Sequence, residues 1–283
     1  MKENIILIGS SGFIGKQIKI RLKKKKIISL NSTNINLFSK KSINKIAHKF
    51  NNSIIIYAAG KKRTKGDTYN NFQKNINFFF NLLYFFSENT PKKLIFLSSV
   101  EVYGEYRVSK KIDEKTEPRP KTLYSLAKLI QEQALKFFAT IYKFEYLILR
   151  LPGIYGRDIE NSSIISKLVK SIDNKHPFKL NSSGKEFRDY VFVKNVANFI
   201  YEIINNNFKN LIINIATGKS YKINEIIKFI EINFKKKLNI IRSEKQSLNK
   251  EYNLKFDNKL IKKLLPKFQF VKLNQFNYKK EFC

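Results

Sequence analysis

The chain has 283 residues, 43% of them hydrophobic and 14% aromatic, so it can bury a full core and is not a disordered protein. A formal net charge of +33 would suit a protein that binds nucleic acid or membrane surfaces, but the lysines are scattered and arginine, the better phosphate and base ligand, is scarce. We interpret the charge as compositional bias and expect no nucleic-acid partner, with a functional basic surface as the alternative.

Cysteine and histidine usage narrows the chemistry further. Cys283 is the only cysteine, so no intramolecular disulfide can form, and a reducing compartment fits. His48 and His176 lie far apart without cysteine neighbours, which argues against a transition-metal site. The longest apolar run, FFFNLLYFF, is too short to span a bilayer, and no signal peptide precedes the first predicted strand. We expect a cytoplasmic protein without metal or membrane.

The first half of the chain alternates short apolar runs with helical patterns. Strands are predicted at residues 4–9, 26–30, 53–60, 92–99 and 145–151, and helices at residues 13–23, 41–50, 68–87 and 123–142. Continuous apolar strands separated by helices indicate a parallel sheet covered on both faces. We therefore predict an α/β fold with a doubly wound, Rossmann-like parallel sheet that binds ligands at the carboxyl ends of its strands. The basic run RLKKKK follows the first helix, where cations suit the helix dipole.

After Leu151 the alternation loosens. Further helices are predicted at about residues 164–172, 195–205, 223–234 and 257–265, and further strands at 190–193, 211–217 and 237–243. We assign residues 1–152 to the Rossmann domain, with about 190–217 returning to it. Residues 153–189 and 218–283 are assigned to a smaller α+β substrate-binding lobe.

The first predicted strand leads into a glycine-rich turn, GSSGFIG. Gly9, Gly12 and Gly15 would allow the backbone to approach a pyrophosphate, and the N-terminus of the following helix supplies positive potential. About 20 residues on, Asn31 stands where an acid normally binds the adenosine ribose of NAD, and Asn36 likewise replaces an acid. Amides do not repel a 2′-phosphate, so the choice between NAD and NADP stays open.

Four Tyr-x-x-x-Lys matches occur, where composition alone would give roughly two, so their setting must decide. Tyr57 and Tyr190 lie in predicted strands and Tyr106 in a predicted loop. Only Tyr124 begins a helix, for which the predicted inward stripe is Ile130, Ala134, Phe137, Phe138 and Ile141.

On a helix Tyr124 and Lys128 share a face, one turn apart. The lysine ammonium would then favour tyrosinate and lower a phenol pKa that starts at about 10. Ser98 and Ser99 end the preceding strand, where a hydroxyl can bond the substrate oxygen that loses or gains a proton. The pattern predicts an acid–base site.

These motifs resemble the extended short-chain dehydrogenase/reductase family, specifically its nucleotide-sugar epimerase/dehydratase branch. The resemblance covers residues 9 to about 265 through GSSGFIG, YAAG, SSVEVYG, YSLAK, RLPGIYG, RDYVFV and NIATG. It implies a catalytic trio of Ser99, Tyr124 and Lys128, with the phenol as general base or acid while a nicotinamide exchanges hydride. It also implies a cofactor site formed by Gly9, Gly12, Phe13, Ile14, Gly15, Asn31, Ala58, Ala59, Gly60, Asn75, Tyr124 and Lys128.

The resemblance further implies that Arg188 binds the diphosphate of a nucleotide sugar, although a local ion pair with Asp189 is the alternative. Gly153 replaces an Asn that often contacts substrate. Glu101 aligns with an acid that dehydratases use, but a solvated Glu is equally compatible. The KKRTKGD segment is interpreted as either a phosphate-facing or a solvated loop.

The resemblance favours C4 epimerisation of a nucleotide-diphosphate sugar through a transient keto-sugar, by a homodimer. The alternatives are an NAD(P)H-dependent 4-keto-sugar-nucleotide reductase, a dehydratase, or a non-catalytic RNA-binding or assembly relative, which the positive charge would assist.

Overall fold

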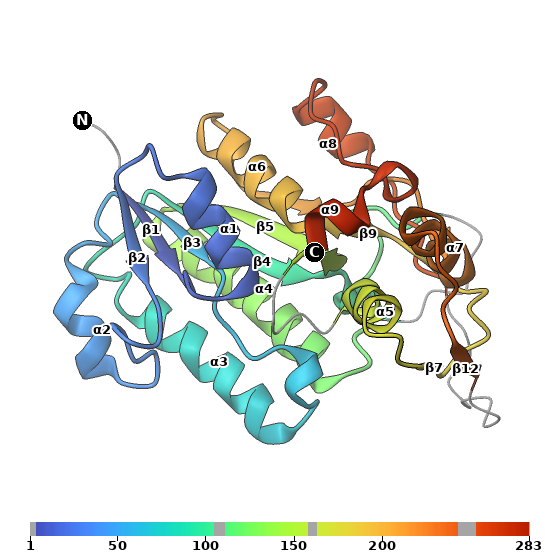
Figure 1. Ribbon diagram of the computed structural model, residues 1–283. Coiled ribbons are helices and arrows are strands. Elements are labelled where there is room, and N and C mark those ends of the chain that lie inside the picture. Colours follow the sequence, from blue (N-terminus) through green and yellow to red (C-terminus); the bar gives the residue numbers. More distant parts are fainter. Residues whose placement is uncertain (1–3, 105–110, 158–162, 243–252, 283) are drawn as a thin grey trace. The chain divides into compact units, whose positions relative to one another are not determined.

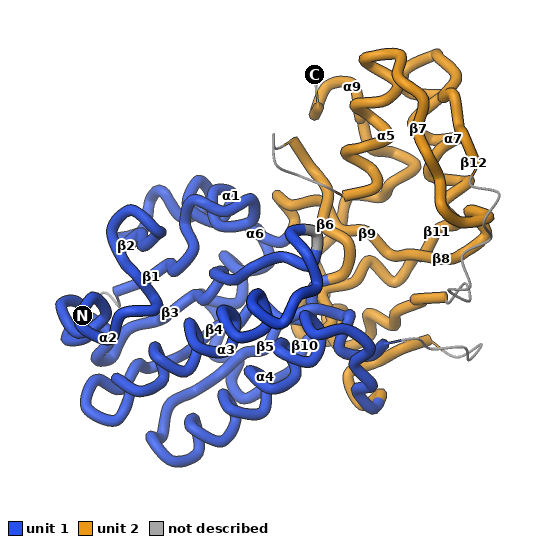
Figure 2. Tube along the Cα trace, turned by 90° about the horizontal axis from the view of Figure 1, so that it is seen from below, with its two compact units in different colours: residues 1–104, 117–151, 196–213 blue, residues 105–116, 152–195, 214–283 orange. Residues whose placement is uncertain are grey.

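The computed structural model describes residues 4–104, 111–157, 163–242 and 253–282. The chain forms two compact units, shown in different colours in Figure 2. Unit 1 comprises residues 1–104, 117–151 and 196–213, and unit 2 comprises residues 105–116, 152–195 and 214–283. Tyr106, one of the four tyrosines considered above, lies outside the described residues.

Unit 1 is built on a six-stranded sheet with the order β2-β1-β3-β4-β5-β10. The strands are β1 (Ile5–Ile8), β2 (Ile27–Leu30), β3 (Ile54–Tyr57), β4 (Lys93–Ser99), β5 (Glu145–Leu151) and β10 (Leu211–Asn214). The pairs from β2 through to β5 are parallel. Because the chain first moves from β1 to one side and then returns to β3 on the other, the switch point that binds ligands in such sheets lies between β1 and β3.

Helices cover both faces of this sheet, as Figure 1 shows. They are α1 (Phe13–Arg21) and α6 (Val193–Ile204) on one face, and α2 (Lys40–Ala47), α3 (Tyr69–Tyr84) and α4 (Leu123–Tyr142) on the other. Two short 3₁₀ helices, η1 (Arg63–Lys65) and η2 (Val100–Tyr103), follow β3 and β4. Thr122 caps α4, where its side chain and that of Ser125 satisfy each other's backbone N–H groups. The predicted doubly wound parallel fold is confirmed.

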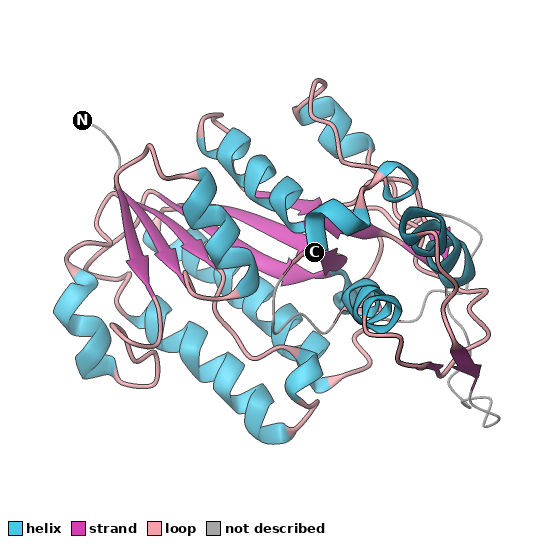
Figure 3. Ribbon diagram, viewed as in Figure 1, coloured by secondary structure: helices cyan, strands magenta, loops and turns pink. Residues whose placement is uncertain are grey.

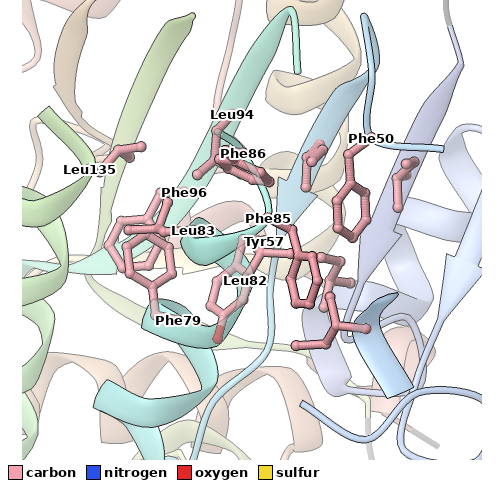
Figure 4. Close-up of a cluster of buried hydrophobic side chains, with 14 of the residues drawn as sticks. Phe50, Tyr57, Phe79, Leu82, Leu83, Phe85, Phe86, Leu94, Phe96 and Leu135 are labelled. Carbon is pink, nitrogen blue, oxygen red and sulfur yellow. The ribbon is translucent and has the colours of Figure 1, made fainter. Parts of the chain in front are cut away.

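The core of unit 1 is an aromatic and aliphatic cluster between the sheet and α3 and α4 (Figure 4). Phe79 of α3 packs edge-on against Tyr57 of β3, with ring centroids 5.1 Å apart, and lies 5.0 Å from the ring of Phe96 on β4. Leu83 and Leu135 are fully buried in the same cluster. Each such side chain contributes about 1.5–3 kcal/mol by leaving water, which fixes both helices against the strands that carry the candidate site.

The buried face of α4 differs from the predicted stripe. Phe137 is 63% exposed and Ile141 is 50% exposed, so their placement in the inward stripe is wrong. The buried side chains of α4 are Ser125, Ala127, Lys128, Gln131, Glu132, Leu135 and Ala139. Polar residues can occupy this buried face because they form hydrogen bonds or ion pairs there with backbone carbonyls and side chains.

Unit 2 contains shorter elements, coloured by type in Figure 3. Its described strands pair in twos: β6 (Gly153–Tyr155) with β9 (Tyr190–Phe192), β7 (Phe178–Leu180) with β12 (Ile240–Arg242), and β8 (Phe187–Arg188) with β11 (Tyr221–Lys222). Its helices are α5 (Ile164–Asp173), α7 (Ile223–Phe234), α8 (Lys259–Leu264), the 3₁₀ helix η3 (Leu273–Gln275) and α9 (Tyr278–Phe282). Within the described residues, no helix has the length and apolar character needed to cross a membrane.

Candidate active site

The glycine-rich turn connects β1 to α1 at the switch point of the sheet. Gly9 has a φ of +89°, and a Cβ there would lie 2.7 Å from the carbonyl carbon of Ala58 on the loop after β3. A Cβ on Gly15 would lie 2.0 Å from the Gly9 carbonyl oxygen. Neither position tolerates a side chain, so a phosphate can approach the backbone of the turn closely. Because the N–H groups of Gly9, Ser10 and Gly12 are bonded to the Leu30 and Gly9 carbonyls, the N-terminus of α1 is the part of the turn left to attract the phosphate.

A cavity of about 460 Å³ opens at the carboxyl ends of β1, β2 and β3. Its walls include Gly9, Gly12, Asn31, Asn36, Ala58, Ala59 and Gly60. Phe13, Ile14 and Gly15 form the first turn of α1 and do not line the cavity. The bare glycine turn and the small Ala-Ala-Gly wall fit the pyrophosphate and adenosine of a dinucleotide, so the residues present match an NAD(P) site.

The two asparagines at the end of β2 are held in local turns. Asn31 accepts hydrogen bonds through its Oδ1 from the N–H and the hydroxyl of Thr33, at 2.8 and 2.5 Å. Asn36 accepts one through its Oδ1 from the N–H of Phe38 at 3.0 Å. Both amides line the cavity without a charge, so neither a free ribose nor a 2′-phosphate is repelled at this wall.

Asn75 of α3 is buried and fixes the loop that follows β3. Its side chain accepts from the Lys61 N–H at 2.7 Å and donates to the Lys61 carbonyl at 3.1 Å. Gln131 of α4 donates to the backbone carbonyl of Asn75 at 2.7 Å. This chain of hydrogen bonds links α4 to the Ala58–Gly60 wall of the cofactor cavity, and so gives Asn75 a supporting position.

Ser99 and Tyr124 meet at the carboxyl end of β4. The Ser99 hydroxyl lies near enough to the phenol to lower the pKa of Tyr124, and Ser99 Oγ accepts from the Glu101 N–H at 3.1 Å. Burial raises the pKa of Tyr124, and the negative charge of Glu101 raises it further, against smaller lowering effects of Ser99 and Arg63. The expected lowering of this pKa by Lys128 is therefore wrong. Desolvation of the phenol outweighs the attraction of nearby cations.

Lys128 lies one turn further along α4 and is buried. Its Nζ donates to the Leu97 carbonyl of β4 at 2.8 Å and lies 4.7 Å from the centre of the Phe96 ring. Burial lowers the pKa of Lys128 to about 8, although the negative charge of Glu132 opposes this shift. The amine is thus anchored to the strand that carries Ser99.

A buried ion pair under the site was not predicted from the sequence. Arg150 of β5 binds Glu132 of α4 through two nitrogens, with Nη2 2.6 Å from Oε2 and Nε 3.1 Å from Oε1. Arg150 Nη1 also donates to the Tyr103 hydroxyl at 2.8 Å, and Ser98 Oγ donates to Glu132. An arginine inside the apolar strand EYLILRL was the available signal, because a buried guanidinium requires an acid.

The KKRTKGD segment is bound to the site and is not a plain solvated loop. Arg63 pairs with Glu101, with Nε 3.2 Å from Oε2. Asp67 accepts from the backbone N–H groups of Leu123 and Tyr124 at 3.2 and 2.8 Å, and so caps α4. Burial raises the pKa of Glu101, Arg63 lowers it and Asp67 raises it. Glu101 is therefore a partly buried acid beside Tyr124, in unit 1.

Arg188 lies in unit 2, on β8, and donates through Nη1 to the Phe187 carbonyl at 2.9 Å. The neighbouring Asp189 is buried and accepts from the Thr217 hydroxyl at 2.8 Å and the Gly218 N–H at 3.2 Å. Burial raises the pKa of Asp189 to about 7, despite these hydrogen bonds. Asp189 thus fastens the NIATG turn to the strand beside Arg188.

Gly153 faces Tyr190 across the β6–β9 pair, also in unit 2. A Cβ on Gly153 would lie 2.4 Å from two ring carbons of Tyr190. The ring therefore fills the space of a side chain at the position where the family pattern often has Asn.

Comparison with known proteins shows to which family the chain belongs. The family model "NAD dependent epimerase/dehydratase family" matches residues 5–216. The chain belongs to this family. The predicted NAD(P)-dependent enzyme of the epimerase/dehydratase branch is thereby confirmed.

Two curated relatives have different reactions in their names. A protein of Methanocaldococcus jannaschii named "Putative UDP-glucose 4-epimerase" is 28% identical over 257 residues, which cover 82% of this chain and 83% of the relative. The dTDP-4-dehydro-6-deoxyglucose reductase of Escherichia coli is 25% identical over 269 residues, which cover 83% of each. The family thus includes both an epimerase and a reductase among proteins of similar distance to this chain.

Solved structures show the same fold. The UDP-glucose 4-epimerase of Thermus thermophilus in complex with NAD has a TM-score of 0.84 at 19% identity and covers 97% of this chain and 96% of its own. RMD from Pseudomonas aeruginosa, complexed with NADPH, has a TM-score of 0.84 at 17% identity and covers 96% and 95%. The two relatives hold different dinucleotides, so the family fold accommodates both.

Proposed function

We propose that this chain is an NAD(P)-dependent nucleotide-sugar epimerase that inverts C4 through a transient 4-keto-sugar. The observation that carries the proposal is that Ser99 and Tyr124 lie near each other at the end of β4, with Lys128 buried one turn along the same helix. A pure binding protein would have no need of a phenol near a serine hydroxyl and one helical turn from a buried amine. The two UDP-glucose 4-epimerases, one by its curated name and one by its solved structure, support this reaction.

The residues of unit 1 supply the proton chemistry. A nicotinamide bound in the cavity of unit 1 would supply reversible hydride acceptance for C4 of the sugar. Tyr124 takes the proton of the sugar 4-hydroxyl as the keto-sugar forms and gives it back as the hydride returns, so the cycle leaves no net change in protons. Ser99 orients the phenol and the substrate oxygen, and Lys128 contributes positive charge from its fixed position on Leu97.

The raised pKa of Tyr124 determines the protonation state of its phenol before substrate binds. The phenol is protonated at neutral pH and is ready to act as an acid towards a keto-sugar. To act as a base, the phenol would need positive charge nearby, which Lys128 and an oxidised nicotinamide would supply. Epimerisation uses both directions in each turnover.

We propose that unit 1 holds the cofactor and unit 2 holds the nucleotide. Arg188 is the proposed diphosphate ligand, since its planar guanidinium can bind two oxygens at once. Tyr190 replaces the volume of an Asn side chain opposite Gly153, so the sugar is held differently here than by relatives with Asn. Glu101 contacts the sugar rather than eliminating water from it, because it is engaged by Arg63.

A homodimer is the proposed assembly. The outer faces of α3 and α4 expose Phe80, Tyr84, Phe137 and Ile141, with exposed fractions of 37%, 57%, 63% and 50%. Phe80 and Phe138 pack edge-on with centroids 6.5 Å apart, so the two helices form one apolar surface. Such a surface suits a second copy of the same chain. With one cysteine and a nicotinamide cofactor, the cytoplasm is the proposed location.

Reduction of a 4-keto-sugar nucleotide is the second candidate. The relative from E. coli is such a reductase by name, and a protonated Tyr124 suits delivery of a proton to a keto oxygen. A reductase consumes NAD(P)H in each turnover, whereas an epimerase keeps its cofactor. The requirement for added cofactor therefore separates the two.

The test is a panel of UDP-, GDP- and dTDP-sugars, and their 4-keto forms, given to the purified protein with and without NADH or NADPH. We expect interconversion of UDP-sugars that differ at C4, without net cofactor consumption. Tyr124→Phe should lower turnover by roughly 10²- to 10⁴-fold and keep cofactor binding. Tyr142→Phe, on the same helix, is the matched control.

Three outcomes contradict the proposal. Net oxidation of NADH or NADPH with a 4-keto substrate assigns the protein to the reductases. Undiminished turnover in Tyr124→Phe removes the acid–base mechanism. Binding of RNA with a steep salt dependence, and no turnover of any sugar, favours the non-catalytic alternative.

A further inference from the structure

A second cavity in unit 1, of about 430 Å³, lies at the edge of the sheet opposite the cofactor cavity. Ile5 and Ile54, the first residues of β1 and β3, line it, whereas Ile8 and Gly9 line the cofactor cavity. Its other walls come from the end of α1 with the residues that follow it and from α6, which lie on the same face of the sheet (Figure 1). The volume is in the range of small-molecule sites. This cavity has no part in the chemistry proposed above.

Arg21 holds a fixed guanidinium in this cavity. Its Nε donates to Asn198 Oδ1 at 2.7 Å, and its guanidinium carbon lies 3.6 Å from the centre of the Tyr201 ring. These contacts engage one nitrogen and one face. Among the described residues, the two terminal nitrogens of Arg21 have no protein partner. A planar fork that is stacked and oriented in advance loses little freedom when it binds two oxygens of an anion.

Three lysines of the RLKKKK run complete the wall. Lys25 Nζ donates to Asn205 Oδ1 at 2.6 Å and lies 5.5 Å from the Tyr201 ring, and Lys24 and Lys26 are exposed. The partners of Arg21 and Lys25 are neutral amides, and no carboxylate is among the described residues that line the cavity. Arg21, Lys24, Lys25 and Lys26 therefore bring four positive charges to one cavity wall that has no acidic side chain. A favourable interaction with the C-terminal end of the α1 dipole does not account for all four, because that interaction falls off within the last turn of a helix.

We propose that this cavity binds a small ligand that carries two or more linked phosphate groups. Arg21 would bind two oxygens of one phosphate through its terminal nitrogens, while Lys24, Lys25 and Lys26 neutralise the remaining charge. The concave shape and the single fixed guanidinium favour a compact polyphosphate over a nucleic acid, whose backbone needs a basic stripe that extends along the protein surface. The site is independent of the proposed epimerase reaction.

The test uses tripolyphosphate, titrated calorimetrically into the full chain saturated with its dinucleotide, at physiological ionic strength, so that the cofactor site is already filled. The double variant Lys24→Gln/Lys26→Gln should lose roughly tenfold in affinity. Its matched control is Lys19→Gln/Lys23→Gln, which removes two exposed charges from the same stretch of chain, outside the cavity. The control should change the affinity by less than about twofold.

Arg21→Lys distinguishes binding by the oriented guanidinium from attraction by positive charge alone, because lysine keeps the charge but cannot bind two oxygens in one plane. We expect it to weaken binding as strongly as the lysine double variant. Acylation of lysines followed by mass spectrometry provides a second measurement on the unaltered chain: tripolyphosphate should protect Lys24 and Lys26, but not Lys19 or Lys23.

The proposal is overturned by any of three results. Equal losses in the two double variants, or wild-type affinity in Arg21→Lys, would show attraction by general charge only. Acylation that proceeds equally at all four lysines would show that no ligand enters the cavity. Tight binding of a short single-stranded RNA through Lys24 and Lys26, which tripolyphosphate does not compete with, would replace the small ligand by a nucleic acid.

Discussion

Both faces of α4 depart from those of an ordinary amphipathic helix, because the buried face includes polar side chains and the exposed face includes large apolar ones. The inner face buries Lys128, Gln131 and Glu132, while the outer face exposes Phe137 and Ile141. These inner side chains are tolerated because each makes at least one hydrogen bond: Lys128 to the Leu97 carbonyl, Gln131 Nε2 to the Asn75 carbonyl, and Glu132 to Arg150. Apolar residues usually mark the core face of a helix, but Phe137 and Ile141 lie on the exposed side of α4.

On α4, therefore, the burial of a side chain does not follow from its hydrophobicity. The inner face positions the chemistry of the site and accepts the cost of desolvation, which is visible in the lowered pKa of Lys128 and the raised pKa of Tyr124. The outer face carries apolar area that the chain alone does not bury. Variants at Glu132, at Lys128 and at Phe137 with Ile141 probe the two faces.

Glu132→Ala should have the largest effect, since it leaves the Arg150 guanidinium buried without its acid. We expect the free energy of unfolding to fall by about 3–5 kcal/mol in urea denaturation. Glu117→Ala, which removes an exposed acid paired with Arg119, is the control and should change it by less than about 0.5 kcal/mol. Replacing both members, as Glu132→Leu/Arg150→Met, should recover most of the loss. Equal stability of wild type and Glu132→Ala would refute the buried pair.

Lys128→Met tests the buried amine through pH. The pKa of Lys128 is about 8 in the native chain and 10.5 when unperturbed, so between these values the unfolded chain binds a proton that the native chain has lost. Stability conferred by Lys128 therefore rises with pH in this window. Between pH 8 and about 9.5, the difference between the free energies of unfolding of the wild type and of Lys128→Met should change by roughly 1.5 kcal/mol in favour of the wild type.

The measurement is urea unfolding of both proteins at each pH, with Lys136→Met on the same helix as the matched control. The lowered pKa of Lys128 would be contradicted if the free energy of unfolding of the wild type did not rise with pH relative to that of Lys128→Met. It would also be contradicted if the rise relative to Lys136→Met were equally large.

Phe137→Ser/Ile141→Ser should have the smallest effect on folding, because both side chains are exposed in the single chain. We expect the unfolding free energy of the monomer to change by less than about 0.5 kcal/mol per site. Sedimentation should nonetheless show a monomer where the wild type is a dimer. Gln133→Ser/Thr140→Ser, two exposed polar positions on the same helix, should leave the dimer intact. A wild type that sediments as a monomer would end the dimer proposal.

The elements of unit 1 could be predicted because each strand is a continuous apolar run and each helix is long enough to show its period. The helix predicted at residues 123–142 has those bounds in the structure. In unit 2, β8 and β11 contain two residues each. Strands this short carry no period of their own and form only because tertiary packing brings them together, so the sequence did not indicate them.

The candidate site divides in the same way. Motif spacing, together with the strands and helices predicted around each motif, led to the proposal of Gly9, Gly15, Tyr124 and Lys128 as site residues. It could not reveal that Glu132 meets Arg150, since that pair joins a helix to a strand through tertiary packing. Helical spacing also gave the wrong direction for the pKa of Tyr124, because it includes the lysine charge but neither desolvation nor Glu101.

The most direct test of the proposed reaction is to follow the hydrogen at C4. UDP-glucose deuterated at C4 is incubated with the purified protein and its bound dinucleotide, and the products are examined by NMR. We expect UDP-galactose that retains deuterium at C4, because the hydride leaves and returns at the same carbon, and conversion by Tyr124→Phe that is slower by roughly 10²- to 10⁴-fold. Loss of the deuterium to solvent during conversion, or equal conversion by Tyr124→Phe, would contradict the proposed reaction.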